Sequence, residues 1–136
     1  MIVLETRVYG LPVAQGRPRA FKTPTGQIRV YDPANARDWK RTVQAQVLTN
    51  KPEVPVDGPL DVALYFVLPR PKSLPKRVKF PTKRPDAENL SKAVLDAMQG
   101  VIYRDDSQIV RLSVAKDYGE APGVWIRVEM LNGAAQ

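Results

Sequence analysis

The sequence contains no cysteine and no histidine in its 136 residues. The absence of cysteine excludes disulfides, thiolate nucleophiles and zinc–thiolate sites. The absence of histidine removes the commonest general base and the imidazole ligands of many metal sites. Hydrolytic chemistry in this chain must therefore use carboxylates, lysine, tyrosine, serine or threonine. Carboxylates without histidine or cysteine favour hard cations such as Mg²⁺.

Long apolar runs are also missing, since no stretch approaches the roughly 20 residues that a bilayer-spanning helix needs. The opening MIVLETRVYGL carries a charge every few residues, unlike the apolar region of a secretory signal. We therefore expect a cytoplasmic protein without membrane association. We also expect no small-molecule cofactor. With 43% hydrophobic residues, the length predicts one domain over residues 1–136.

Positive charge is in excess, with 21 Lys+Arg against 14 Asp+Glu and a net charge of +7, which favours a polyanionic partner. The segment 70–85 holds seven Lys or Arg, several prolines and no acid, which predicts a mobile, exposed basic loop. LPVAQGRPRAFKTPTG (11–26) is predicted to be a basic loop punctuated by proline and glycine, and GRPRAFK (16–22) within it has a composition similar to that of 70–85. Phe80 is expected either to stack against a base or to anchor the loop in the core. The residues predicted to contact nucleic acid are Arg17, Arg19, Lys22, Lys72, Lys76, Arg77, Lys79, Phe80, Lys83 and Arg84.

The pattern of apolar residues predicts an α+β fold. Alternation of apolar and polar residues predicts strands at 1–10 and 108–118, and 60–69, the most strongly apolar segment, is predicted to be the central strand. Further strands are predicted at 27–31 and 124–131. Three- and four-residue spacing predicts helices at 34–49 and from 87 to about 98, ended by Gly100. The last two strands, separated by GEAPG, are expected to pair as an antiparallel hairpin. The order β(β)αβαββ predicts a mixed four- to five-stranded sheet with two helices packed on it. The expected buried helix positions are Trp39, Val43, Val47, Leu48, Leu90, Ala93, Val94, Ala97 and Met98.

Four acids follow the basic loop closely, at Asp86, Glu88, Asp105 and Asp106. One interpretation is structural: Asp86 caps a helix and the Asp pair forms a turn. The other is chemical. If the chain after Gly100 folds back along the helix, the carboxylates would meet, and a divalent cation would relieve their repulsion. Lys92, otherwise an exposed solvated lysine, would then stabilise charge developing on phosphorus.

The segment KRPDAENLSKAVLDAMQGVIYRDDSQIVRLSVAKDYG (83–119) resembles the core of the RusA family, the crossover-junction endodeoxyribonucleases or Holliday junction resolvases. QGRPRAF resembles a segment of the phage-type members. The resemblance implies that Asp86, Glu88 and Asp106 are catalytic metal ligands, that Asp105 is a further ligand and that Lys92 is catalytic. At Glu88 the family usually has aspartate, and glutamate reaches one methylene further.

The resemblance implies an Mg²⁺-dependent endonuclease, with Mn²⁺ as the alternative ion, that resolves four-way junctions by paired phosphodiester hydrolysis in recombination and repair. It also implies a homodimer, in a bacterial host cell and encoded by the host, a phage or a prophage. Three alternatives stay open: a non-catalytic nucleic-acid-binding phage regulator on the same fold, a nuclease for flaps or other branched DNA, and a basic structural or assembly protein.

Overall fold

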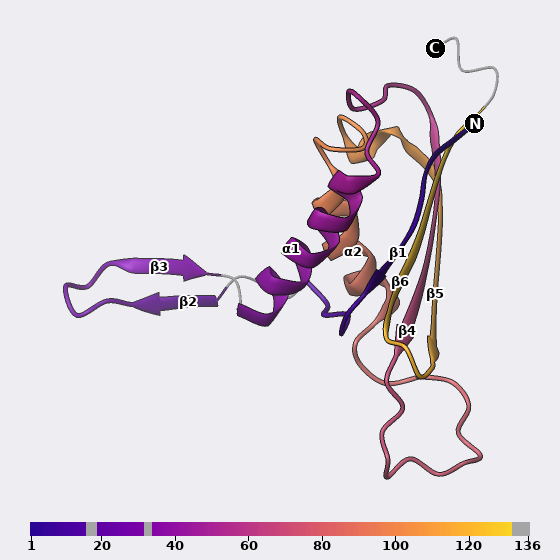
Figure 1. Cartoon of the computed structure of the whole chain (residues 1–136). Coiled ribbons are helices and arrows are strands. Elements are labelled where there is room, and N and C mark those ends of the chain that lie inside the picture. The colour runs from indigo at the N-terminus through magenta and orange to yellow at the C-terminus, as the bar shows by residue number, and fades with distance from the viewer. Residues whose placement is uncertain (16–18, 32–33, 132–136) are drawn as a thin grey trace.

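Two helices cover one face of a four-stranded sheet in the computed structural model, which describes residues 1–15, 19–31 and 34–131 (Figure 1). The described elements are β1 (Ile2–Tyr9), β2 (Arg19–Lys22), β3 (Ile28–Tyr31), α1 (Ala34–Thr49), β4 (Leu60–Leu68), α2 (Ala87–Met98), a 3₁₀ turn at Asp106–Gln108, β5 (Ile109–Tyr118) and β6 (Gly123–Met130). The order and the two layers confirm the predicted α+β fold. Among the described residues, no helix is both long and apolar enough to cross a bilayer.

The sheet is mixed, with strand order β1-β6-β4-β5. β6 pairs antiparallel with β1 and with β4, whereas β5 pairs parallel with β4. The predicted β5–β6 hairpin is therefore wrong, because β4 lies between these two strands. Strands adjacent in sequence are usually neighbours in a sheet, and this rule fails here.

The short connection from β5 to β6 crosses the end of β4. The Gly119 N–H donates to the carbonyl of Leu68 at 3.0 Å, and the Gly10 N–H donates to that of Pro122 at 3.1 Å. A Cβ at Gly119 would lie 2.5 Å from Cγ1 of Val67, so the crossing needs glycine at this point. The connection thus reaches β6 without a long loop.

A separate antiparallel pair, β2 and β3, forms a two-stranded sheet of its own (Figure 1). The prediction that 11–26 is entirely loop is wrong, since β2 lies within it. The four-residue strand is too short for an alternating pattern to stand out in the sequence.

The core lies between the helices and the sheet. Alternate residues of β4 face the helices and are buried, and the predicted apolar face of α2 is buried against them. On α1, Val43 and Val47 are completely buried. The prediction for Leu48 is wrong: it is 47% exposed, because the residue after Val47 points about 100° further round a helix.

Candidate active site

Asp86 lies at the entry to α2, where the basic loop becomes helix. Its backbone carbonyl accepts from the Leu90 N–H at 3.0 Å, which starts the helix. Its side chain makes no capping hydrogen bond and instead accepts from Nδ2 of Asn89 at Oδ2, 3.1 Å away. The position is that of an N-cap, but the exposed carboxylate is not used to cap the helix.

Glu88 and Lys92 lie one turn apart on the exposed side of α2. The Lys92 Nζ is 3.4 Å from Oε1 of Glu88, and both side chains are largely exposed. Such an exposed i,i+4 pair contributes only about 0.3–0.5 kcal/mol. Lys92 is thus paired rather than simply solvated, but the pair is weak.

Asp105 and Asp106 lie at the other end of α2 and differ in their contacts. Asp105 is the N-cap of the 3₁₀ turn, and its Oδ1 accepts from the Ser107 N–H at 3.1 Å. The Asp106 N–H donates to Oε1 of Gln99 at 3.3 Å. The turn-forming interpretation therefore holds for Asp105, while the exposed Asp106 carboxylate has no capping role.

The two neighbouring carboxylates shift each other's pKa in opposite directions. A hydrogen bond to Asp105 raises the pKa of Asp106, and loss of solvation and the charges of Asp105 and Asp96 raise it further. Hydrogen bonds from Ser107 and Asp106 lower the pKa of Asp105. Asp106 therefore holds its proton more tightly than Asp105 does.

The two acidic groups do not meet at one point. The 12 residues of α2 span about 18 Å, with Asp86 at one end and Asp106 near the other. The chain after Gly100 stays at the C-terminal end of the helix, because the Tyr103 hydroxyl donates to the Leu95 carbonyl at 2.6 Å. Within the described part of the chain, no three Asp, Glu, His or Cys side chains are placed to hold a metal ion together. The four predicted ligands therefore do not fit a single ion within one chain, and metal binding by each of them stays a prediction.

Gln108 positions the paired acids, although sequence reasoning did not identify it. Its Oε1 accepts from the backbone N–H groups of Arg104 and Asp105, both at 2.9 Å. Its Nε2 donates to the carbonyls of Val56 and Gly58 at 2.9 and 3.1 Å. One side chain thus closes the 104–108 turn and attaches it to the segment before β4. The glutamine three residues after Asp105 was the available signal, since it completes a capping box.

Lys116 is a second positioning residue that the sequence did not reveal. From β5 its Nζ donates to the carbonyls of Lys83 and Pro85 at 2.9 and 2.8 Å. These bonds hold the end of the basic loop immediately before Asp86. No local pattern marks Lys116, because its partners lie more than 30 residues away in the sequence.

The basic loop has no helix or strand, as predicted, but it contains internal bonds. The Arg70 guanidinium donates to the carbonyls of Pro75 and Val78 at 2.7 and 2.6 Å. Phe80 is 66% exposed, so the alternative that it anchors the loop in the core is wrong. Loop mobility stays a prediction. The predicted DNA-contacting cations that the structure shows exposed are Lys22, Lys72, Lys76, Arg77, Lys79, Lys83 and Arg84. Arg17 and the side chain of Arg19 lie outside the described residues.

Comparison with known proteins identifies the family of the chain. The sequence profile of the family described as "Endodeoxyribonuclease RusA" matches residues 10–129. The chain is 38% identical over 138 aligned residues to "Uncharacterized protein YqaN" of Bacillus subtilis (strain 168), covering 94% of this chain and 96% of that protein. It is 29% identical over 123 residues to "Crossover junction endodeoxyribonuclease rusA" of Lactococcus phage r1t, covering 87% of this chain and 89% of that protein. The family match includes both acidic groups, Lys92 and the whole basic loop, and the chain belongs to the RusA family of endodeoxyribonucleases.

Proposed function

We propose that this chain is a divalent-metal-dependent endonuclease that resolves four-way DNA junctions by paired incision. The observation that carries the proposal is the family match over residues 10–129, which contains every acid of the candidate site. The similarity to a phage protein named as a crossover-junction endodeoxyribonuclease supports junctions as the substrate. Cleavage of this kind belongs to DNA recombination and repair, in a bacterial cell and from a host, phage or prophage gene.

In the proposed reaction, water attacks phosphorus and the bond to the 3′ oxygen breaks, which leaves a 5′-phosphate and a 3′-hydroxyl. The proposed catalytic residues are Asp86, Glu88, Lys92 and Asp106. Lys92 stabilises the negative charge that develops on the phosphoryl oxygens. Its weak ion pair with Glu88, at 3.4 Å, leaves the ammonium available for this contact.

The proposed ion is Mg²⁺, with Mn²⁺ as the alternative, and when bound it would activate water and shield phosphoryl charge. The proposed ligands are Asp86, Glu88, Asp105 and Asp106, which within one chain form two separate groups at the two ends of α2 rather than a single site. Oxygen-only donors in a chain without histidine or cysteine fit such hard cations. Because Asp105 already caps the 3₁₀ turn, we expect it to contribute less to metal binding than Asp106 does.

The basic loop supplies the proposed affinity for DNA. Carboxylates near the cleaved bond repel phosphate, so binding must come from cations that release counterions from the duplex. Six exposed lysine and arginine side chains of the loop meet this need, and the exposed Phe80 offers a surface on which a base stacks. The end of the loop is held next to Asp86 by Lys116.

The test is incubation of the purified protein with a synthetic four-way junction, a flap and a linear duplex, each with Mg²⁺, Mn²⁺ or EDTA. We expect paired nicks in opposed strands of the junction, dependent on the metal. Equal cutting of flaps and junctions would identify a branched-DNA nuclease of another specificity. Binding without cutting under any metal would refute the nuclease and favour a regulator.

A further inference from the structure

A groove of about 610 Å³ lies beside the basic loop, which extends beyond the ends of β4 and β5 (Figure 1). Its walls are residues 11–14, the end of β4 at Leu68, the prolines of the basic loop and Tyr118 at the end of β5. The volume falls within the roughly 300–1,000 Å³ of small-molecule sites and is large enough for a nucleobase with its sugar. The proposed reaction gives this groove no role.

Prolines and anchored side chains shape the groove before a ligand arrives. The prolines that line it are Pro12, Pro69, Pro71, Pro81 and Pro85. Because a proline has a fixed φ, these positions lose little conformational entropy when a ligand binds. On the loop side, the Lys116 Nζ donates to the carbonyls of Lys83 and Pro85 at 2.9 and 2.8 Å. On the β5 side, the Arg70 guanidinium lies 5.6 Å over the Tyr118 ring and orients it, without lining the groove itself.

The lining of the groove combines apolar surface with positive charge. Most of its residues are apolar, its charged residues are Lys83 and Arg84, and none of the described residues that line it is acidic. Tyr118 adds an aromatic ring on which a base can stack. Asn35 and Ser73 add hydrogen-bonding groups of the kind that contact base edges. A flat ligand attached to negative charge fits this lining, and a nucleotide of DNA is such a ligand.

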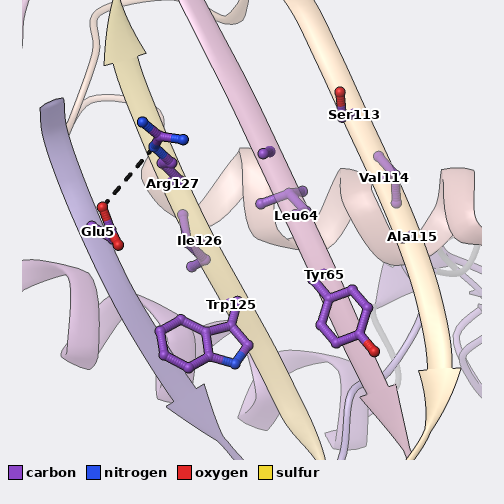
Figure 2. A pocket seen from close by; sticks show the side chains of 10 residues that line it. Glu5, Leu64, Tyr65, Ser113, Val114, Ala115, Trp125, Ile126 and Arg127 are labelled. Atoms are coloured by element: carbon purple, nitrogen blue, oxygen red, sulfur yellow. Dashed lines mark ion pairs between the residues drawn. The ribbon is translucent and has the colours of Figure 1, made fainter. Parts of the chain in front are cut away.

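The hollow on the face of the sheet away from the helices differs from the groove in its charges (Figure 2). It has a volume of about 390 Å³, and its lining includes Arg127 and Glu5, whose charged groups lie 4.0 Å apart. That arginine is thus already paired. By contrast, Lys83 and Arg84 are exposed, and neither forms an ion pair with another described residue. The cations of the groove are therefore the ones available to a phosphate.

The groove ends beside Asp86. Pro85 lines it and Asp86 follows directly, with about 3.8 Å between their Cα atoms. Residues 11–14 form the other wall, and directly after them the Gln15 N–H donates to the Asn89 carbonyl in the first turn of α2 at 3.1 Å. Asn89 in turn donates from Nδ2 to Asp86 at 3.1 Å. A base in the groove therefore lies next to any phosphate held at Asp86.

We infer that this groove takes one base extruded from the branch point of the DNA, stacked on Tyr118, with the backbone beside Lys83 and Arg84. The inference rests on the proposed function and deepens it, since it says how a branched substrate is distinguished from a duplex. Extruding a base costs least where pairing or stacking is already lost, as it is at a branch. In linear DNA this cost is not reduced, so linear DNA binds through the basic loop without filling the groove.

The first test uses the wild-type protein. Four-way junctions carry a single 5-iodouracil at each position near the branch in turn and are irradiated with the protein, in EDTA to prevent cleavage. We expect one position to cross-link to Tyr118, identified by mass spectrometry, and the same sequence in a linear duplex to give no such cross-link. The absence of cross-links to the groove from every junction position, or equal cross-links from the duplex, would overturn the inference.

The second test is a double-substitution cycle between Tyr118 and the base. Tyr118→Leu removes the ring, Tyr118→Phe is the matched control that keeps it, and an abasic nucleotide at the cross-linked position removes the base. Tyr118→Leu should bind the intact junction about 5- to 150-fold more weakly, the range for the loss of one base stack. The abasic nucleotide should weaken binding by wild type and Tyr118→Phe and have no further effect on Tyr118→Leu. Independent losses, or equal behaviour of the two variants, would overturn the inference.

Ser73→Trp keeps the inference testable if Tyr118→Leu does not fold. Ser73 is exposed on the basic loop, so a tryptophan there fills the groove without entering the core. It should weaken binding of the four-way junction and leave the affinity for linear duplex unchanged. Val54→Trp is the control and should alter neither affinity, because Val54 is 64% exposed and precedes β4, whereas the basic loop follows β4. Unchanged junction affinity of Ser73→Trp would contradict the inference.

These outcomes are separate from those of the nuclease test, because they are measured as binding in EDTA. A protein that cross-links at Tyr118 and shows the expected cycle but cuts no DNA refutes the proposed function and leaves the base site standing. A protein that nicks junctions in pairs, while Tyr118→Leu binds and cuts as the wild type does, refutes the base site alone.

Discussion

Replacing Gln108 by alanine removes the side chain that fixes the turn of Asp105 and Asp106. Four hydrogen bonds disappear at once, two accepted at 2.9 Å and two donated at 2.9 and 3.1 Å. The two accepted bonds shape the turn, and the two donated bonds attach it to the segment before β4. We therefore expect both stability and activity to fall.

The magnitude follows from the kind of bond. Each neutral hydrogen bond contributes a net of about 0.5–1.5 kcal/mol. Water can rehydrate the Arg104 and Asp105 N–H groups, because both residues are exposed. Four such bonds would sum to about 2–6 kcal/mol, and rehydration places the expected loss of stability near the low end, at about 2–3 kcal/mol. An unfolding entropy of about 2.1 cal/mol/K per residue gives about 3.5 °C per kcal/mol for a chain of this length, and hence a Tm lower by about 7–10 °C.

Thermal unfolding followed by circular dichroism measures the effect, with Gln99→Ala as the matched control. Gln99 accepts one long bond, at 3.3 Å from the Asp106 N–H, so its loss should lower Tm by less than about 3 °C. Below the melting range, Gln108→Ala should lose junction cleavage while keeping junction binding. Equal Tm shifts for the two variants would refute the assignment of Gln108 as the residue that holds the turn.

Three further predictions concern the site. Asp86→Asn and Asp106→Asn should each abolish cleavage while junction binding in a mobility-shift assay survives or tightens, since a charge that repels phosphate is removed; weaker binding would indicate a structural role. Lys116→Met should reduce cleavage and Tm because the carbonyls of Lys83 and Pro85 lose their donor. Lys72→Met is the control and should leave Tm unchanged, because Lys72 is exposed and makes no hydrogen bond in the described part of the chain. Asp105→Asn should lower the pKa of Asp106, because the hydrogen bond to Asp105 is the largest cause of the raised pKa. Carboxyl chemical shifts of the metal-free protein, measured against pH, test this prediction. An unchanged or higher pKa of Asp106 would contradict it.

The elements with strong periodicity were predictable from the sequence. The apolar face of α2 follows helical spacing over 12 residues, and all five predicted core positions on it are buried. The alternation in β1 and β5 and the strongly apolar composition of β4 likewise predicted these strands. These features depend on local geometry, which a single segment of sequence encodes.

Pairing between segments was not predictable in the same way. β6 lies between β1 and β4 because the connection from β5 to β6 crosses the end of β4 at Gly119. The length of that connection in the sequence does not show which strand it crosses. Similarly, Lys116 positions the loop end through carbonyls on a distant segment. The four acids of the candidate site could be identified in the sequence by their residue type and spacing. Their distribution over the two ends of α2 depends on how Tyr103 holds the turn that follows the helix.

The position of acids beside the most basic segment has a physical explanation in this arrangement. Carboxylates that lie exposed along α2 would repel a DNA backbone, and the exposed cations of the loop offset that repulsion. Because Lys116 fixes the end of the loop one residue before Asp86, the proposed function would have phosphate bound by the loop placed close to the N-terminal acids rather than elsewhere on the surface. Under that proposal, affinity and chemistry would reside in different residues, joined by the short anchored segment between them.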